Sequence, residues 1–295
     1  MKHLAIGLLA FVAFAFAAGC GNGATTTVAE DSTTAVATDS FDVAANWKIG
    51  IQMWTFNHFS FTEALNKADS AGVKNIEAYW GQPLGGDMKG EFGIAMNDGT
   101  RVKLKALLQS KGIQIVAMGV IGPADKAEWV KAFDLAKEFG LSYITSEPKK
   151  DQWNMIDSLA GVYGIKVAIH EHANPNPYWH PDSVLAAING HPNIGACGDV
   201  GHWGRSGLDP VECLKKLEGH IYGVHLKDIK VFNQEHAEDT VVSKGVLNFP
   251  AIFAELKRQQ FKGMMSIEQE SNWLNSLPDV TGTVKYYNEQ VAKLK

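Results

Sequence analysis

Imidazoles and carboxylates recur along this chain directly after short apolar runs, in a pattern that could bring them to one point. Four of the ten histidines follow three successive runs of this kind. Burying such groups together without partners would be costly, and a divalent cation removes that cost. Two or three carboxylates with one or two imidazoles suit Mn²⁺, Mg²⁺, Co²⁺ or Zn²⁺ rather than a cation that prefers thiolates. The residues concerned are Glu77, Glu147, His170, His172, Asp199, His202, His225, Glu268 and Glu270.

Eight runs rich in β-branched and apolar residues must position these side chains, and a helical pattern follows each run. Predicted helices often end in glycine just before a strand, as at Gly72, Gly112, Gly140 and Gly164. Glycine accepts the left-handed conformation that closes a helix. Strands that alternate with helices indicate parallel pairing with right-handed crossovers. The predicted strands are 48–54, 74–80, 113–120, 141–145, 165–170, 193–199, 221–225 and 263–268.

Eight strand–helix units in a chain of this length predict an α/β protein of the (β/α)8 TIM barrel class. An open, doubly wound sheet is the rival arrangement. It is less favoured because the first strand runs into Thr55-Phe-Asn-His-Phe59 instead of a glycine-rich phosphate loop. The predicted helices are 61–68, 101–108, 129–139, 153–163, 181–188, 210–217, 249–259 and 281–294.

The C-terminal ends of the strands are where such a barrel carries its chemistry. Successive strand residues point to opposite faces, so residues two apart share a side. Glu171, between two histidines, therefore points away from both. The pairs that share a side are His170 with His172, His225 with Lys227, and Glu268 with Glu270.

A metal ligand is best placed at the last inward position of its strand. This favours Asp199, His225 and Glu268. A fourth ligand must then come from Glu147 or from His170.

Each of these residues alone also has a purely structural interpretation. A lone histidine is more often a hydrogen-bonded structural residue than a ligand. Glu147, which precedes Pro148, could begin a turn, Glu77 could face a helix, and Asp228 could cap the loop after the seventh strand. The convergence of several such residues at one end of the barrel favours a functional site.

Three motifs on the last three strands carry a family resemblance. The segments Asp199-Val-Gly-His202, His225-Leu-Lys-Asp228 and Ile267-Glu-Gln-Glu270 resemble the xylose isomerase-like TIM-barrel superfamily. More narrowly, the chain is similar to its sugar phosphate isomerase/epimerase branch, which includes tagatose epimerases, inosose dehydratases and dehydroshikimate dehydratases. The resemblance covers residues 47–295.

The resemblance implies one divalent metal ion held by Glu, Asp, His and Glu. Asp199, His225 and Glu268 match the last three ligands. Family epimerases usually carry Glu at the end of strand five, where this chain has His170, and this departure weakens a symmetric mechanism with two carboxylates. Glu147 is the expected replacement, followed by His170.

The expected mechanism begins with a metal ion that binds a sugar carbonyl and hydroxyl and stabilises an enediolate. His170 or His172 would act as the general base, because imidazole titrates near neutral pH. Lys227 could stabilise oxyanion charge, and His202 could bind a hydroxyl or transfer a proton. The residues expected to contact substrate are Trp54, Glu77, Trp80, Trp203 and Glu270, with core or rim packing as the alternative for the tryptophans.

These features predict a divalent-metal-dependent sugar isomerase or epimerase that acts on a non-phosphorylated carbohydrate. A lyase or hydratase acting by elimination on a keto-sugar or 3-keto-glycoside is the first alternative, and a non-catalytic carbohydrate-binding lipoprotein is the second. The superfamily also contains zinc endonucleases that cut DNA at abasic sites. The formal net charge of −5 disfavours a nucleic-acid partner, which usually needs a basic face.

The N-terminus has the features of an export signal. Lys2 and His3 precede an apolar run, 4–18, that ends in small residues before Cys20. The pattern resembles a bacterial lipoprotein signal, in which a lipid on Cys20 would be the only membrane attachment. An ordinary cleaved signal is the alternative. Residues 21–46, rich in Thr, Ala, Ser and Asp, are expected to form a flexible tether to a barrel at 47–295.

We therefore expect an extracytoplasmic protein, in the periplasm or on the outer membrane. Phosphorylated sugars are mainly cytoplasmic, and apart from Lys149, Lys150 and Lys227 no obvious cluster of basic residues appears at the strand ends. The expected partner is therefore a small, non-phosphorylated sugar; the oligomeric state does not follow from these residues. Cys197 and Cys213 are expected as buried free thiols or as a disulfide.

Overall fold

The computed structural model describes residues 43–294. The predicted signal peptide at 1–20, the lipid on Cys20 and most of the predicted tether at 21–46 lie outside the described residues. The end of that tether, η1 (Val43–Asn46), is a 3-10 helix with Val43 and Ala44 buried. Residues just before Trp47 are therefore part of the folded structure. Within the part that the structure describes, no helix is both long and apolar enough to cross a membrane.

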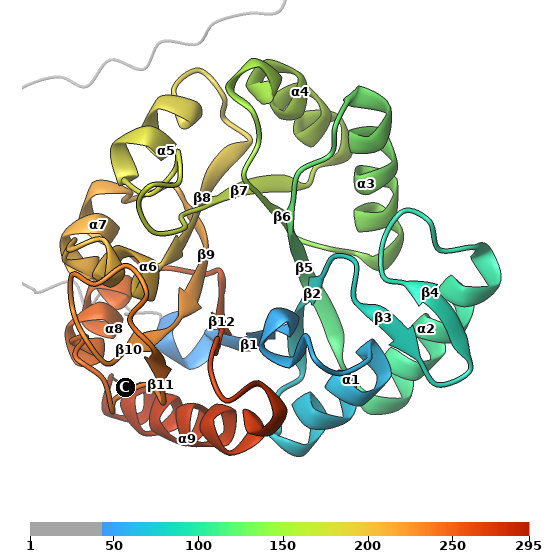
Figure 1. Cartoon of the computed structure of the whole chain (residues 1–295). Helices are drawn as coiled ribbons and strands as arrows, with labels where there is room; N and C mark the ends of the chain where they lie inside the picture. Colours follow the sequence, from blue (N-terminus) through green and yellow to red (C-terminus); the bar gives the residue numbers. More distant parts are fainter. Residues whose placement is uncertain (1–42, 295) are drawn as a thin grey trace, which may run out of the picture. The chain divides into compact units, whose positions relative to one another are not determined.

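Eight parallel strands close into a barrel in the order β1-β12-β9-β8-β7-β6-β5-β2 (Figure 1). This confirms the predicted (β/α)8 TIM barrel, and each strand overlaps one predicted run. The bounds are β1 (Lys48–Gln52), β2 (Asn75–Tyr79), β5 (Gln114–Ile121), β6 (Tyr143–Ser146), β7 (Lys166–His170), β8 (Ile194–Asp199), β9 (Ile221–Leu226) and β12 (Met264–Ile267).

Helices surround the strands as an outer ring (Figure 1). Three of them end at a glycine in the left-handed conformation, as predicted: Gly112, Gly140 and Gly164 have φ of 61°, 71° and 68°. The helices are α1 (Phe61–Ser70), α2 (Asp98–Lys111), α3 (Lys126–Phe139), α4 (Trp153–Tyr163), α5 (Pro181–Ile188), α6 (Val200–Arg205), α7 (Pro210–Lys216), α8 (Phe249–Arg258) and α9 (Leu277–Leu294).

Several elements in the connections that follow the strands are absent from the sequence prediction. The helix α6 begins directly at the end of β8, where the Asp199 side chain accepts a hydrogen bond from the His202 backbone N–H at 2.8 Å. This cap is the local reason for the sharp strand-to-helix turn. The other elements are β3 (Pro83–Gly85), β4 (Met88–Glu91), β10 (Asp228–Ile229), β11 (Asp239–Thr240), η2 (Met53–Phe56), η3 (Lys150–Gln152) and η4 (Trp273–Asn275).

The barrel separates two apolar layers. One buried cluster includes Tyr143, Ala168 and Cys197. By the alternation of strand residues, Ala168 shares the face of His170, and Cys197 shares the face of Asp199, so this cluster fills the barrel interior. The larger cluster lies between strands and helices and includes Trp129, Phe133 and Phe253. The polar residues at the strand ends therefore stand above a filled interior.

The described chain enters the barrel at the end opposite these polar residues. Trp47, just before β1, donates a hydrogen bond from Nε1 to the Phe261 carbonyl at 2.8 Å. Its ring packs against Phe253 with centroids 6.2 Å apart. These contacts fix the start of β1 against α8.

Candidate metal centre

Four buried side chains at the ends of separate strands converge on one point. His170 (β7), Asp199 (β8), His225 (β9) and Glu268, which follows β12, each offer one ligand atom, and these atoms lie within 4.8 Å of one another. His225 Nδ1 lies 3.0 Å from Glu268 Oε2 and 3.6 Å from Asp199 Oδ2. His170 Nε2 lies 3.6 Å from the same Asp199 oxygen. Two nitrogens and two carboxylate oxygens are a donor set that suits a divalent transition metal.

Asp199 Oδ2 supports this interpretation. The atom is buried and accepts no hydrogen bond within the described part of the chain, although the Lys227 ammonium lies 3.2 Å away; Oδ1 caps α6. Burying a carboxylate oxygen without a hydrogen bond costs free energy. A cation at this point would remove that cost, so the residues present fit a bound metal ion.

The second nitrogen of each imidazole is held by a carboxylate outside the four-residue set. His170 Nδ1 lies 3.2 Å from Glu147 Oε1, and His225 Nε2 lies 2.9 Å from Glu77 Oε2. A carboxylate that accepts the distal N–H fixes the tautomer and the ring orientation of a metal-binding histidine. His170 Nε2 and His225 Nδ1 are thereby left to face the metal position.

The surrounding carboxylates raise the pKa values of these two imidazoles. Burial disfavours a charge on His170, but the carboxylates of Asp199 and Glu147 outweigh burial and raise its pKa to about 9. Burial is likewise outweighed at His225, where the carboxylates of Glu77 and Glu268 hold the pKa well above its usual value. The carboxylates therefore favour positive charge at this point.

A second polar network flanks the metal position. The buried Lys227 Nζ lies 2.9 Å from Glu268 Oε2, 2.8 Å from Glu270 Oε2 and 3.2 Å from Asp199 Oδ2. It also lies 3.1 Å from His202 Nε2. Burial and the adjacent Lys227 charge hold the pKa of His202 well below its usual value, so His202 is a neutral partner near pH 7.

Arg205, on α6, also belongs to this network. It donates to Glu270 Oε2 at 2.9 Å, contacts the Asp239 carboxylate, and donates from Nε to the Ala237 carbonyl at 3.1 Å. Lys227 and Arg205 thus both form ion pairs with carboxylates. Sequence reasoning missed Arg205 and Asp239. The i, i+3 spacing of Arg205 from His202 was an available signal for the first, whereas Asp239 lies far from every predicted strand end.

A cavity of about 200 Å³ lies beside the metal position. Its lining includes His172, Glu268 and Glu270 together with Trp54 and Tyr79. The His172 side chain is 41% exposed, and its Nδ1 contacts Glu147 Oε1. Glu147 is in turn fixed by Asn176, which donates from Nδ2 to Oε2 at 2.8 Å. His172 is therefore an oriented imidazole that faces a space large enough for a small molecule.

The remaining residues predicted to contact substrate lie in different places. Glu77 is fully buried beneath His225 and outside the cavity lining. Trp203 is fully buried and packs on Gly198, where an added Cβ would lie 2.4 Å from the indole ring. Trp80 is half-buried and does not line the cavity. Of the five residues predicted to contact substrate, Trp54 and Glu270 therefore line the cavity. Glu77, Trp80 and Trp203 do not.

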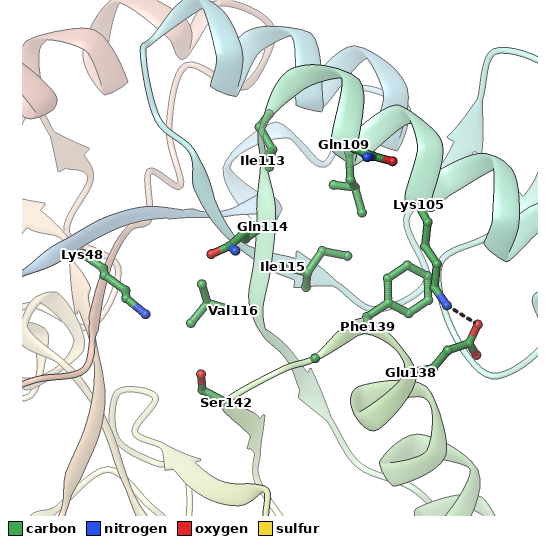
Figure 2. A pocket seen from close by; sticks show the side chains of 12 residues that line it. Lys48, Lys105, Gln109, Ile113, Gln114, Ile115, Val116, Glu138, Phe139 and Ser142 are labelled. Carbon is green, nitrogen blue, oxygen red and sulfur yellow. Dashed lines mark hydrogen bonds and ion pairs between the residues drawn. The ribbon is translucent and has the colours of Figure 1, made fainter.

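A larger cavity, of about 520 Å³, lies at the strand starts near the C-terminal ends of α2 and α3 (Figure 2). Its charged groups are Lys48 and the pair Lys105–Glu138, in which Nζ and Oε1 lie 2.8 Å apart. Figure 2 shows that its other walls combine apolar side chains such as Ile115 and Phe139 with the uncharged polar side chains of Gln109, Gln114 and Ser142. The convergence of ionisable groups, rather than volume, identifies the opposite end as the candidate site.

Comparison with known sequences agrees with this geometry. The family model described as "Xylose isomerase-like TIM barrel" matches residues 65–292. An inosose dehydratase of Clostridium botulinum (strain Alaska E43 / Type E3) is 27% identical over 159 residues, which cover 46% of this chain and 52% of that protein. The chain thus matches about half the length of this curated relative.

Solved structures show the same architecture. An uncharacterised protein from Parabacteroides distasonis ATCC 8503 is 34% identical, with a TM-score of 0.68 over 83% of this chain and 99% of that one. The protein IOLI, solved with a bound zinc atom, is 17% identical, with a TM-score of 0.66 over 84% of this chain and 99% of that one. The second likeness shows the fold alone.

Proposed function

Because the chain belongs to the xylose isomerase-like TIM barrel family, we propose that it is a divalent-metal-dependent sugar isomerase or epimerase. It would remove a proton beside a carbonyl of an uncharged carbohydrate and return that proton to the same or the neighbouring carbon. The observation that carries this proposal is the convergence of His170, Asp199, His225 and Glu268 beside a cavity that contains an oriented imidazole.

The metal ion would be held by these four residues, with His170 in the place for which Glu147 was the first candidate. Geometry supports this choice, because Glu147 contacts the Nδ1 atoms of His170 and His172, whereas His170 Nε2 faces Asp199. A bound divalent cation would supply Lewis acidity that lowers the cost of negative charge on a sugar oxygen.

His172 is the proposed general base. Its side chain reaches the cavity, and Glu147, backed by Asn176, holds its Nδ1. The Glu147 carboxylate on its distal nitrogen would stabilise the imidazolium that forms when the ring accepts a proton. Lys227 and neutral His202 do not line the cavity. Lys227 would act through Glu268 and Glu270, which do line it, by offsetting their negative charge.

The charge balance supports an uncharged substrate. Six carboxylates surround the site: Glu77, Glu147, Asp199, Asp239, Glu268 and Glu270. Lys227 and Arg205 already pair with four of them. A divalent ion would therefore still leave no surplus positive charge for a phosphate group. A free sugar or a glycoside fits this site better than a sugar phosphate.

Elimination is the second candidate outcome. The curated relative named above is a dehydratase, and His170 stands where a two-carboxylate epimerase would carry Glu. Both outcomes share the first proton abstraction and differ in what leaves next. A lyase would lose a β-substituent instead of regaining the proton.

The extracytoplasmic location is also a proposal. It is supported by the basic start, the apolar run and Cys20 at the N-terminus. With a lipid on Cys20, the barrel would meet sugars outside the cytoplasm.

Proton exchange in D₂O tests the proposed function. The protein loaded in turn with Mn²⁺, Co²⁺, Zn²⁺ and Mg²⁺ is incubated with keto-sugars and keto-glycosides, and NMR follows the loss of α-proton signals. We expect metal-dependent exchange that Asp199→Asn abolishes, since asparagine retains the helix cap but removes the ligand charge. Exchange that persists in Asp199→Asn would refute the proposal. Metal and sugar binding without exchange would favour a non-catalytic carbohydrate-binding protein.

A further inference from the structure

We infer that a row of aromatic rings at the barrel mouth forms a second sugar subsite, so that the substrate has a ring beyond the one at the metal centre. The mouth aromatic row is defined as Tyr79, Trp54, Trp273 and His58. The inference rests on the proposed function, because it takes the cavity beside the metal position as the first subsite.

The row is continuous from the cavity outwards. Tyr79 and Trp54 line the cavity, with ring centroids 4.7 Å apart. Trp273 follows at 6.1 Å from Trp54, and His58 stacks on Trp273 with centroids 5.7 Å apart and planes at 26°. Tyr79 is the last residue of β2, and the other three rings lie in the connections that follow β1 and β12. These are three adjacent strands of the barrel.

The row keeps contact with solvent. His58 is exposed, and Tyr79, Trp54 and Trp273 are each half-buried. Trp129 and Phe133, beneath the helices of this protein, are by contrast closed away from water. Half-buried tryptophans with an apolar body and a polar N–H are typical of binding surfaces.

The chemistry of the row suits a sugar ring. An aromatic face is electron-rich, and the C–H groups on one side of a pyranose carry partial positive charge and interact weakly with it. The ligand class that fits these aromatic faces is therefore a glycosyl ring or a ring-shaped aglycone.

The size of the cavity limits how many sugar rings it can hold. About 200 Å³ is below the usual range for a drug-sized ligand of two or more rings. The space beside the metal position would thus hold one ring, and a second ring joined to it would extend over Trp54 towards Trp273. The proposed substrate class is a glycoside of at least two rings rather than a free monosaccharide.

Calorimetric binding tests this inference. D-glucose, D-galactose, cellobiose, maltose and lactose are titrated into the Mn²⁺-loaded protein and into Trp273→Ala and Leu274→Ala. Leu274 is the matched control, because it is the neighbouring residue and is 74% exposed. We expect at least one disaccharide to bind about tenfold more tightly than either monosaccharide, because stacking of one additional sugar ring on an aromatic side chain increases affinity by about this factor. Trp273→Ala should remove this advantage, whereas Leu274→Ala should retain it.

Three results would overturn the subsite: equal affinity for both lengths, equal weakening of both lengths by Trp273→Ala, or no binding of any of these sugars. None of them bears on the metal centre. The metal-dependent proton exchange described above fails only if the proposed function itself is wrong. The two experiments therefore distinguish a missing subsite from a missing activity.

Discussion

At the scale of single residues, two buried histidines share one design. Each presents one nitrogen to the metal position and gives the other to a carboxylate, Glu147 for His170 and Glu77 for His225. The two carboxylates differ in surroundings: Glu77 is fully buried, whereas the Glu147 side chain is 21% exposed and also contacts His172. Glu147 thus connects a candidate ligand to the candidate base.

Removing either carboxylate charge should weaken metal binding without removing a ligand. We expect Glu77→Gln and Glu147→Gln each to lower metal affinity by about 10- to 100-fold, measured by competition with a chromophoric chelator. Glu171→Gln is the matched control, since Glu171 lies in the same part of the chain but points to the opposite face of β7. Unchanged affinity in both variants would show that these carboxylates do not position the imidazoles.

The sequence predicted most residues of this site but did not decide whether Glu147 or His170 is the fourth ligand. Alternation along the strand correctly implied that His170 and His172 share a side. It left Glu147 and His170 as rival ligands, because Glu147 follows its strand and its direction depends on contacts such as the one from Asn176. That partner lies on a loop with no periodic signal, so only the folded chain shows it.

At the scale of elements, one carboxylate organises the long connection after β9. Asp228 Oδ1 accepts hydrogen bonds from the backbone N–H groups of Ile229 and Leu247, and Oδ2 accepts from Ser243 and Gly245, all at 2.9–3.2 Å. The interpretation of Asp228 as a loop cap therefore agrees with these contacts. The loop carries Asp239, which reaches Arg205 and the Glu270 backbone N–H.

Asp228→Asn should loosen this loop and destabilise the protein. Asparagine presents one acceptor oxygen, so two of the four N–H groups lose their partner whichever way the amide is oriented. At about 1.5 kcal/mol for each hydrogen bond to a charged group, we expect a loss of about 3 kcal/mol in the free energy of unfolding, measured in urea. Glu238→Gln, at an exposed ion pair in the same loop, should cost less than about 1 kcal/mol. Equal small effects would contradict the role of Asp228.

The regular helices and strands could be predicted from the sequence because local residue patterns determine them. Helix-ending glycines such as Gly112 and Gly140, and eight apolar runs, are read directly from residue types. The short α6 was missed, since its six residues look like the end of a strand until Asp199 is seen to cap it. Short elements fixed by one capping hydrogen bond leave little periodic signal.

At the scale of the whole molecule, the sheet divides the core and separates the cysteines. Cys197 belongs to the cluster inside the barrel, and Cys213, on α7, belongs to the cluster between strands and helices. Both thiols are free and buried. Of the two arrangements expected from sequence, the structure shows free thiols.

These thiols should react slowly in the native protein. Burial raises the pKa of Cys197 to about 12 and that of Cys213 above its usual value, so little thiolate is present at pH 8. In a chain that begins after Cys20, we expect Ellman's reagent to detect two thiols in guanidinium chloride and almost none within minutes in buffer. A rapid native reaction, or a count below two in denaturant, would contradict this arrangement.

The point at which the chain enters the barrel has a practical consequence. Trp47 and Lys48 stand at the end of the cylinder opposite the metal position. A purification handle or a bead linkage attached ahead of residue 43 would therefore hold the domain at the end that carries the strand starts. The cavity beside the metal position would stay free for reagents, so immobilised protein can be assayed without a linker designed to clear it.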